Sequence, residues 1–337
     1  MTRIAEPRTP SRRQFLKGVA VLGGGALAIS GGAALWPSSD RNGTVPSASP
    51  APGEPPSPEV LVDAITEGGP GKDGIPAIDR PQFVPAGRAD FLSDDEPVFG
   101  LIHRGEVRAY PQFVLVWHEI VNDTVAGQRM AVTYCPLTGT VIGFTGVRGG
   151  PELTFGTTGN LVNSNLLMYD RQSESEWPQL IGAAIRGPRK GQRLGTVPLV
   201  WASWKAWRTT HPDTKVLSTE TGSLRSYGKD PYGSYPRRSG YYVEGRPIFP
   251  VLATDNRFPA KEVVIGISTG ERTVAVHREL VRRARSVPVA LAGAHVTAVW
   301  DEALDTVRVT GTDDAADVLD AMWFAWYAFH PDTQVLR

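Results

Sequence analysis

The chain has one cysteine, Cys135, among its 337 residues, and only six histidines and four methionines. A single thiol excludes an internal disulfide, so the stability of the fold has to come from burial of apolar side chains. The sequence also lacks the P-loop and H-E-x-x-H fingerprints. P-loop nucleotide-hydrolysing enzymes and zinc metalloproteases of the H-E-x-x-H type are therefore excluded.

Neither sign of charge dominates, because 35 Lys and Arg residues stand against 35 Asp and Glu residues. Residues 1–36 hold five of the basic residues and one acid, which leaves 30 basic and 34 acidic residues and a net charge of −4 in the remainder. This balance argues against a nucleic-acid or anionic-membrane surface. We expect no nucleic-acid partner, and membrane contact only through an uncleaved N-terminal segment.

The N-terminal segment carries the pattern of a twin-arginine export signal. Arg12 and Arg13 stand in Ser-Arg-Arg-Gln-Phe-Leu-Lys, and residues 18–36 are uncharged and rich in Gly and Ala. This weak hydrophobicity suits a signal better than a stable membrane span, although an ordinary anchor helix is the alternative. We predict a signal or anchor over residues 1–36, the twin-arginine translocase as a partner, and a periplasmic or other extracytoplasmic location. Residues 37–58, dense in Pro and Ser, predict a disordered linker.

The body of the chain is predicted to contain an internal duplication. Residues 96–145 align without a gap with residues 262–311 at an offset of 166. Residues 204–217 align with residues 323–336 at an offset of 119, with nine identities in 14 positions. The second copy is thus shortened by about 47 residues. Both copies keep His-Pro-Asp-Thr, so we interpret His211 and His330 as residues that end helices.

Alternating apolar residues predict mainly strands, with helices expected over residues 113–120 and 203–210. We therefore predict a strand-rich α+β fold. A first copy occupies residues 59–260 and carries the functional site, and a shortened second copy occupies residues 261–337 as scaffold.

Residues found only in the first copy are the candidate functional residues. Cys135 corresponds to Asp301 in the second copy, and His118 corresponds to Ala284. A scaffold that folds without these residues does not require them, which favours a functional role. The candidate catalytic residues are Cys135 and His118, and the candidate ligand-binding residues are Asn163, Asn165, Asp170, Arg171, Glu174, Trp177 and Gln179. The alternatives are a buried structural thiol, a hydrogen-bonded histidine and an ordinary salt-bridged loop.

Cys135, His118 and Met168 are also candidate ligands of a copper or zinc ion, because Cys, His and Met together ligate copper in proteins. The alternative for Met168 is a place in the core, which is the commoner role of methionine.

Several motifs together resemble one exported prokaryotic family. They are Trp-His-Glu-Ile-Val-Asn-Asp at residues 117–123, Tyr-Cys-Pro-Leu at 134–137, Asn-Ser-Asn-Leu at 163–166 and Met-Tyr-Asp-Arg-Gln at 168–172. With Asp-Gly-Ile-Pro-Ala-Ile-Asp at 73–79, Ser-Glu-Trp at 175–177 and the His-Pro-Asp-Thr blocks, they make the chain similar to the domain-of-unknown-function family 3179 from about Asp73 onward. The resemblance implies no established reaction. Relatives often have Cys-Pro-Leu-Cys where this chain has Thr138, so a dithiol pair or two-thiolate metal clip is excluded within this turn.

Three hypotheses follow. The first is an exported protein that binds a small ligand or metal around Cys135 and His118. The second is a thiol-dependent extracytoplasmic enzyme that uses the same pair. The third is a non-catalytic cell-envelope interaction protein with a purely structural body.

Overall fold

The computed structural model describes residues 53–243, 245–270, 272–291, 294–311 and 316–337. The predicted signal and most of the predicted linker lie outside these residues. The first described helix, α2 (Pro58–Asp63), begins one residue inside the predicted linker, because Ser57 caps it and proline is favoured in a first helical turn. In the described ranges, no helix is long and apolar enough to cross a membrane.

The fold is strand-rich α+β, as predicted, and residues 59–260, called the first half, contain two of its larger sheets. Their strand orders are β12-β3-β4-β13-β2 and β11-β7-β6-β5. The strands are β2 (Phe83–Pro85), β3 (Pro97–His103), β4 (Glu106–Pro111), β5 (Ile120–Val125), β6 (Gln128–Cys135), β7 (Thr140–Val147), β11 (Leu194–Val197), β12 (Val200–Ser203) and β13 (Lys215–Leu217). The helical elements are η1 (Ala86–Arg88), α3 (Gln112–Leu115) and α4 (Trp204–Thr210).

The helix predicted over residues 113–120 is wrong in length. Only α3 is helical there, and Ile120 already pairs with Thr133 as the first residue of β5. The helix predicted over residues 203–210 is confirmed as α4, with Ser203 as its N-cap and His211 as its C-cap.

A further sheet of the first half is built mostly from residues that the second copy lacks in the alignment. Its order is β1-β8-β9-β10. These strands are β1 (Thr66–Glu67), β8 (Phe155–Val162), β9 (Asn165–Asp170) and β10 (Glu176–Pro178), and a small hairpin, β14 (Gly233–Ser234) and β15 (Ser239–Gly240), follows later. Asn163 and Ser164 join β8 to β9 with φ values of 51° and 61°. Two successive left-handed residues are typical of the tightest hairpin turns.

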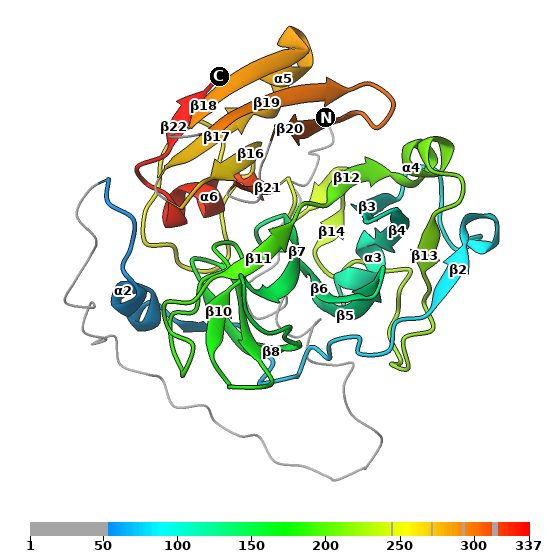
Figure 1. Cartoon of the computed structure of the whole chain (residues 1–337), viewed down its shortest axis with the longest axis horizontal. Coiled ribbons are helices and arrows are strands. Elements are labelled where there is room, and N and C mark those ends of the chain that lie inside the picture. The colour runs from blue at the N-terminus through cyan, green and yellow to red at the C-terminus, as the bar shows by residue number, and fades with distance from the viewer. Residues whose placement is uncertain (1–52, 244, 271, 292–293, 312–315) are drawn as a thin grey trace, which may run out of the picture.

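Residues 261–337, called the second half, form two sheets at the top of Figure 1. Their orders are β21-β16-β17-β22 and β18-β19-β20. The elements are β16 (Val263–Ser268), β17 (Thr273–His277), α5 (Arg278–Ala284), β18 (Ser286–Leu291), β19 (Ala294–Asp301), β20 (Thr306–Thr310), β21 (Asp317–Met322), α6 (Trp323–Phe329) and β22 (Gln334–Leu336).

The strand order of the second half follows that of the first half. The order β21-β16-β17-β22 parallels β12-β3-β4-β13, and in both sheets an antiparallel hairpin is followed by a parallel pairing of its second strand. The order β20-β19-β18 likewise parallels β7-β6-β5.

Each half also places a tryptophan ring directly on a glycine of its first sheet. A Cβ atom at Gly100 would lie 2.1 Å from the ring of Trp207, and one at Gly266 would lie 2.2 Å from the ring of Trp326. Only glycine leaves room for a ring at that distance, so these two positions fix how α4 and α6 pack.

The His-Pro-Asp-Thr blocks hold the same tryptophans from the other side. Trp207 donates from Nε1 to Thr214 Oγ1 at 3.1 Å, and the corresponding bond of Trp326 to Thr333 is 3.0 Å. The rings of His211 and His330 lie 4.3 Å from their tryptophans, and both histidines are helix C-caps. Their geometry is that of residues that end helices.

The two halves are joined by polar contacts as well as by packing. Asp317 of β21 accepts from Arg148 at 2.8 Å and from Thr196 Oγ1 at 2.6 Å. The backbone N–H of Met322 donates to the carbonyl of Thr138 at 2.9 Å, in the turn that follows Cys135. The second half therefore helps to fix the position of that turn.

A buried Cys135–Glu119 cluster as the candidate site

Cys135 ends β6, opposite Thr140 of β7, and is 1% exposed. Its sulfur lies 3.9 Å from the carbonyl oxygen of Ser164. Burial, helped by the nearby negative charge of Glu119, raises the pKa of the Cys135 thiol to about 11. The thiol is therefore protonated at neutral pH, whereas a reactive cysteine needs a lowered pKa.

Glu119 lies between α3 and β5 in a left-handed conformation, with φ of 58°. Its N–H donates to the Leu115 carbonyl and its carbonyl accepts from Tyr134, both at 2.7 Å, so the backbone is held on both sides. Left-handed backbone is uncommon for residues other than glycine, and such residues cluster at functional sites.

The Glu119 side chain is 6% exposed. Burial raises the pKa of its carboxyl to about 8 and is the only cause of the shift. In the part of the chain that the structure describes, no group donates a hydrogen bond to this carboxyl. A carboxyl with no protein donor can form a hydrogen bond with a molecule in the space beside it. At pH 7 it is mostly a neutral carboxylic acid, able to donate and accept.

Glu119 lines a small cavity of about 40 Å³. Its other walls are mainly apolar and come from Gly68, Pro70, Ile75, Leu137, Thr157, Gly159, Asn160, Leu161, Leu166, Tyr232 and Phe249. The segment of residues 68–71 closes one side, where the N–H of Gly68 donates to the carbonyl of Gly159 at 2.8 Å. Because Gly159 has φ of 81° and a Cβ there would lie 1.9 Å from the Pro70 carbonyl oxygen, the closure requires glycine.

A tyrosine-rich segment, residues 227–242, covers the other side of the cluster. It holds five of the nine tyrosines of the chain. Burial and the charges of Glu119 and Cys135 raise the pKa of Tyr232 well above its usual value, which places these three side chains together. Tyr241 donates its hydroxyl to the Leu137 carbonyl at 2.7 Å. Neither Tyr232 nor this segment is among the residues predicted from the sequence, although the density of tyrosine was a usable signal.

His118 is fully buried, and its two ring nitrogens are already engaged. Nδ1 lies 2.7 Å from the Pro76 carbonyl and Nε2 lies 2.7 Å from the Tyr227 hydroxyl. Burial lowers the pKa of His118 to about 4, so the ring is neutral at pH 7. The Cys135 sulfur contacts the carbonyl oxygen of Ser164 and not His118. The two predicted catalytic residues, Cys135 and His118, are therefore not hydrogen-bonded to each other in the described region.

Three of the predicted ligand-binding residues lie close to the Cys135 turn. Asn165 donates to the hydroxyl of Thr138 and to Gln179 Oε1, both at 2.9 Å, and Gln179 donates to Thr133 at 3.1 Å. Asn163 donates to the carbonyl of Ala328 in α6 at 3.1 Å. These amides stabilise the turn and its contact with the second half. Thr138, which stands where relatives often have a second cysteine, takes part in the same network.

The other four predicted ligand-binding residues lie at the opposite end of β9. Asp170 is fully buried and accepts from Trp177 Nε1 at 3.0 Å. Arg171 pairs with Asp79 at 2.7 Å, and Glu174 pairs with Lys72 at the surface. The predicted ligand-binding set therefore divides into one group beside Cys135 and another that organises the β9–β10 turn.

Met168, the third candidate metal ligand, is fully buried in β9 opposite Trp177 of β10. Over the described ranges, no group of three or more His, Cys, Asp or Glu side chains is placed to hold a metal ion. A metal at Cys135 and His118 would also have to displace the bonds from His118 to Pro76 or Tyr227.

Two stretches match catalytic fingerprints in letters only. Residues 266–270 spell G-x-S-x-G, but Ser268 ends β16 and leads through a hairpin into β17 rather than into a helix. Residues 69–74 spell G-x-G-x-x-G, but they follow the two-residue strand β1 and lead into a loop. Neither stretch has the strand-turn-helix context that the corresponding chemistry needs.

The fold and the buried cluster define a strand-rich α+β protein with a small cavity beside Glu119. A family model described as a protein of unknown function, DUF3179, matches residues 72–319. The chain therefore belongs to this family, as the motifs predicted. No curated protein and no solved structure matches the chain.

Proposed function

We propose that the protein binds a small neutral molecule in the cavity beside Glu119. The observation that carries this proposal is the Glu119 carboxyl, which is buried and has no hydrogen-bond donor among the described residues, on a residue that lines a small cavity. A hydrogen bond typically contributes about 0.5–1.5 kcal/mol net, so a ligand that bonds this carboxyl gains affinity from the bond.

The cavity sets the chemistry of this ligand. A volume of about 40 Å³ admits roughly three atoms the size of a water oxygen. The apolar walls favour a short hydrocarbon part, and the neutral carboxylic acid of Glu119 favours a single hydroxyl, carbonyl or amide group. A charged ligand is disfavoured because the surrounding apolar walls would not solvate it.

Cys135 supports this site by position and not as a resting nucleophile. With a pKa of about 11, its thiolate is scarce at pH 7. Ligand binding is therefore favoured over the thiol-dependent enzyme, and the engaged His118 ring favours a neutral molecule over a metal ion.

The experiment that tests this proposal is a ligand-observed NMR titration of the chain lacking residues 1–52 with ethanol, acetamide and acetonitrile. About 1.5 kcal/mol per non-hydrogen atom is the ceiling for small ligands, so a four-atom compound can bind no more tightly than tens of micromolar. We expect at least one compound to bind, and Glu119→Leu to weaken it about tenfold through loss of the hydrogen bond.

The matched control is Glu67→Leu, which changes an exposed glutamate on β1. Binding that survives Glu119→Leu, or a wild-type protein that binds none of the three compounds, contradicts the proposal.

We further propose that the protein is exported through the twin-arginine route and works outside the cytoplasm, and that its body arose by duplication. The Arg12-Arg13 pattern supports the first statement, and the parallel strand orders support the second.

Replacement of Arg12 and Arg13 by Lys in the full chain is expected to leave the protein in the cytoplasm of its native host, as measured by cell fractionation. Normal export of that variant contradicts the export proposal.

A further inference from the structure

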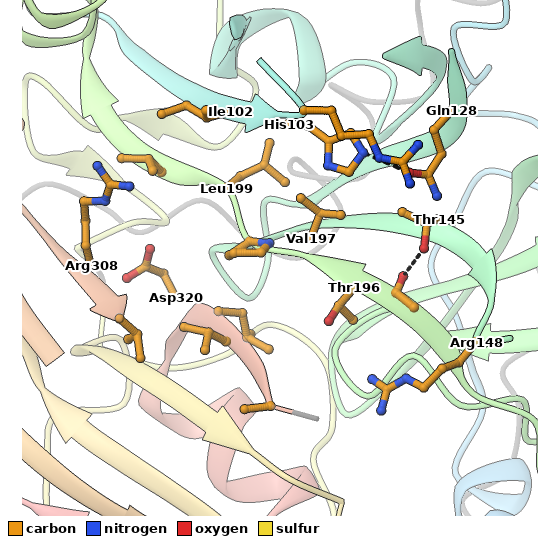
Figure 2. Close-up of a pocket in the computed structure, with 18 of the residues that line it drawn as sticks. Ile102, His103, Gln128, Thr145, Arg148, Thr196, Val197, Leu199, Arg308 and Asp320 are labelled. Atoms are coloured by element: carbon orange, nitrogen blue, oxygen red, sulfur yellow. Dashed lines mark hydrogen bonds between the residues drawn. The ribbon is translucent and has the colours of Figure 1, made fainter. Parts of the chain in front are cut away.

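A second and much larger cavity lies between the two halves, as Figure 2 shows. This cleft has a volume of about 670 Å³ and is lined by β3, β7 and β11 from the first half and by β16, β20 and β21 from the second half. Its size is within the range of roughly 300–1,000 Å³ that is typical of small-molecule sites. Such sites often lie where two structural units meet.

Asp320 of β21 faces this cleft, and one of its carboxyl oxygens has no partner. Oδ1 is buried and accepts no hydrogen bond from any of the described residues. Burial raises the pKa of Asp320 to about 6, partly offset by the charge of Arg278. The carboxylate is thus mostly ionised at pH 7 while it lacks a donor.

Asp317, three residues earlier on the same strand, shows that the interface can satisfy a carboxylate. It accepts from Arg148 and Thr196 at 2.8 and 2.6 Å, and Arg193 lies 3.4 Å away. Asp317 and Asp320 are three residues apart on one strand, so their side chains point to opposite faces of the sheet and the donors at Asp317 do not serve Asp320.

A positive group lies on the same side of the cleft. Arg308 of β20 lines the cleft together with Asp320, as Figure 2 shows. Arg308 is only loosely paired, 3.8 Å from Asp301, and its side chain is 45% exposed. Across the cleft, Val197 and Leu199 present apolar side chains. The acidic Asp320, the cationic Arg308 and an apolar wall thus line the same cleft, whose rim also carries Arg104 and Glu152.

We propose that this cleft binds an amino acid with an apolar side chain. Its ammonium group would donate to Asp320, its carboxylate would pair with Arg308, and its side chain would pack against Val197 and Leu199. A charge-assisted bond to the Asp320 carboxylate is the strongest of these contacts. This site is separate from the Glu119 cavity, and it gives the second half a binding role instead of a purely structural one.

Isothermal titration with three related probes tests the proposal. Leucine carries both charged groups, 3-methylbutylamine lacks the carboxylate, and 4-methylpentanoate lacks the amine. We expect leucine to bind most tightly, the amine to bind more weakly, and 4-methylpentanoate to bind at least tenfold more weakly than leucine.

Two variants separate the contacts. Asp320→Asn is expected to weaken leucine binding at least tenfold, and Arg308→Ala is expected to weaken leucine binding while leaving the amine unchanged. The matched control is Asp305→Asn, an exposed residue in the β19–β20 turn, which should bind leucine as the wild type does. Absence of leucine binding to the wild type, equal binding of 4-methylpentanoate, or unchanged leucine binding in Asp320→Asn would each overturn the assignment. Because Arg308 is partly exposed, its variant keeps the test valid even if Asp320→Asn does not fold.

Discussion

Replacing Glu119 by Gln is expected to raise the free energy of unfolding at pH 7 by about 3 kcal/mol. The pKa of this buried carboxyl is raised from 4.5 to about 8. Between these two values the folded state keeps a proton that the unfolded state has lost, so stability falls as the pH rises through this window. Glutamine has the same shape and stays neutral at every pH, which removes this cost.

The gain in the free energy of unfolding should disappear near pH 4, where the Glu119 carboxyl is protonated in both the folded and the unfolded state. Urea denaturation of the wild type and Glu119→Gln at pH 4 and pH 7 measures the difference. Glu67→Gln, which changes an exposed carboxyl, should alter the free energy of unfolding at neither pH. An equal gain at both pH values would mean that the stabilisation does not come from ionisation. Functional sites often cost a protein stability, so a residue whose ionisation destabilises the fold is a candidate functional residue.

Replacing Gly100 or Gly266 by Ala is expected to destabilise the protein by about 3 kcal/mol at each site, the upper end of the usual cost of overpacking. The new methyl group would meet the ring of Trp207 or Trp326 at 2.1 or 2.2 Å. Neither ring can move away freely, because each indole N–H is bonded to a buried threonine. Each variant is expected to lose the packing of α4 or α6 against its sheet.

Thermal and urea unfolding of both variants measure this cost. The control is Gly87→Ala, since a Cβ at Gly87 would meet nothing within 4 Å. If Gly100→Ala or Gly266→Ala unfolds at the wild-type midpoint, the close packing of the tryptophan ring on that glycine is contradicted. Similar losses at both positions would also support the proposed duplication.

The sequence predicted those parts of the fold that depend on local signals. Alternation predicted the strands, and the residue before Pro212 or Pro331 predicted where α4 and α6 end. The helix over residues 113–120 was too long, because apolar residues from Phe113 to Ile120 suit a buried helix and a buried strand equally well. Pairing of Ile120 with Thr133, a contact between distant residues, decides the boundary.

The candidate site was predicted in part. Cys135, Asn165 and Gln179 share one neighbourhood, whereas His118 is bonded to Tyr227 on a segment whose position no local pattern indicates. Glu119 was not among the site residues predicted from the sequence. Its importance comes from burial and from its left-handed backbone, and both depend on tertiary packing. Asp320 has no local signal either, because only the cleft between the halves leaves it unpaired.

The most direct test of the central claim, a buried neutral carboxylic acid that faces a ligand cavity, is an NMR titration of the glutamate side-chain carboxyl carbons. One glutamate signal is predicted to titrate near pH 8, to be absent in Glu119→Gln, and to shift when a compound from the binding series is added. If every glutamate carboxyl titrates below pH 6, Glu119 is solvated or paired, and the proposed site is contradicted.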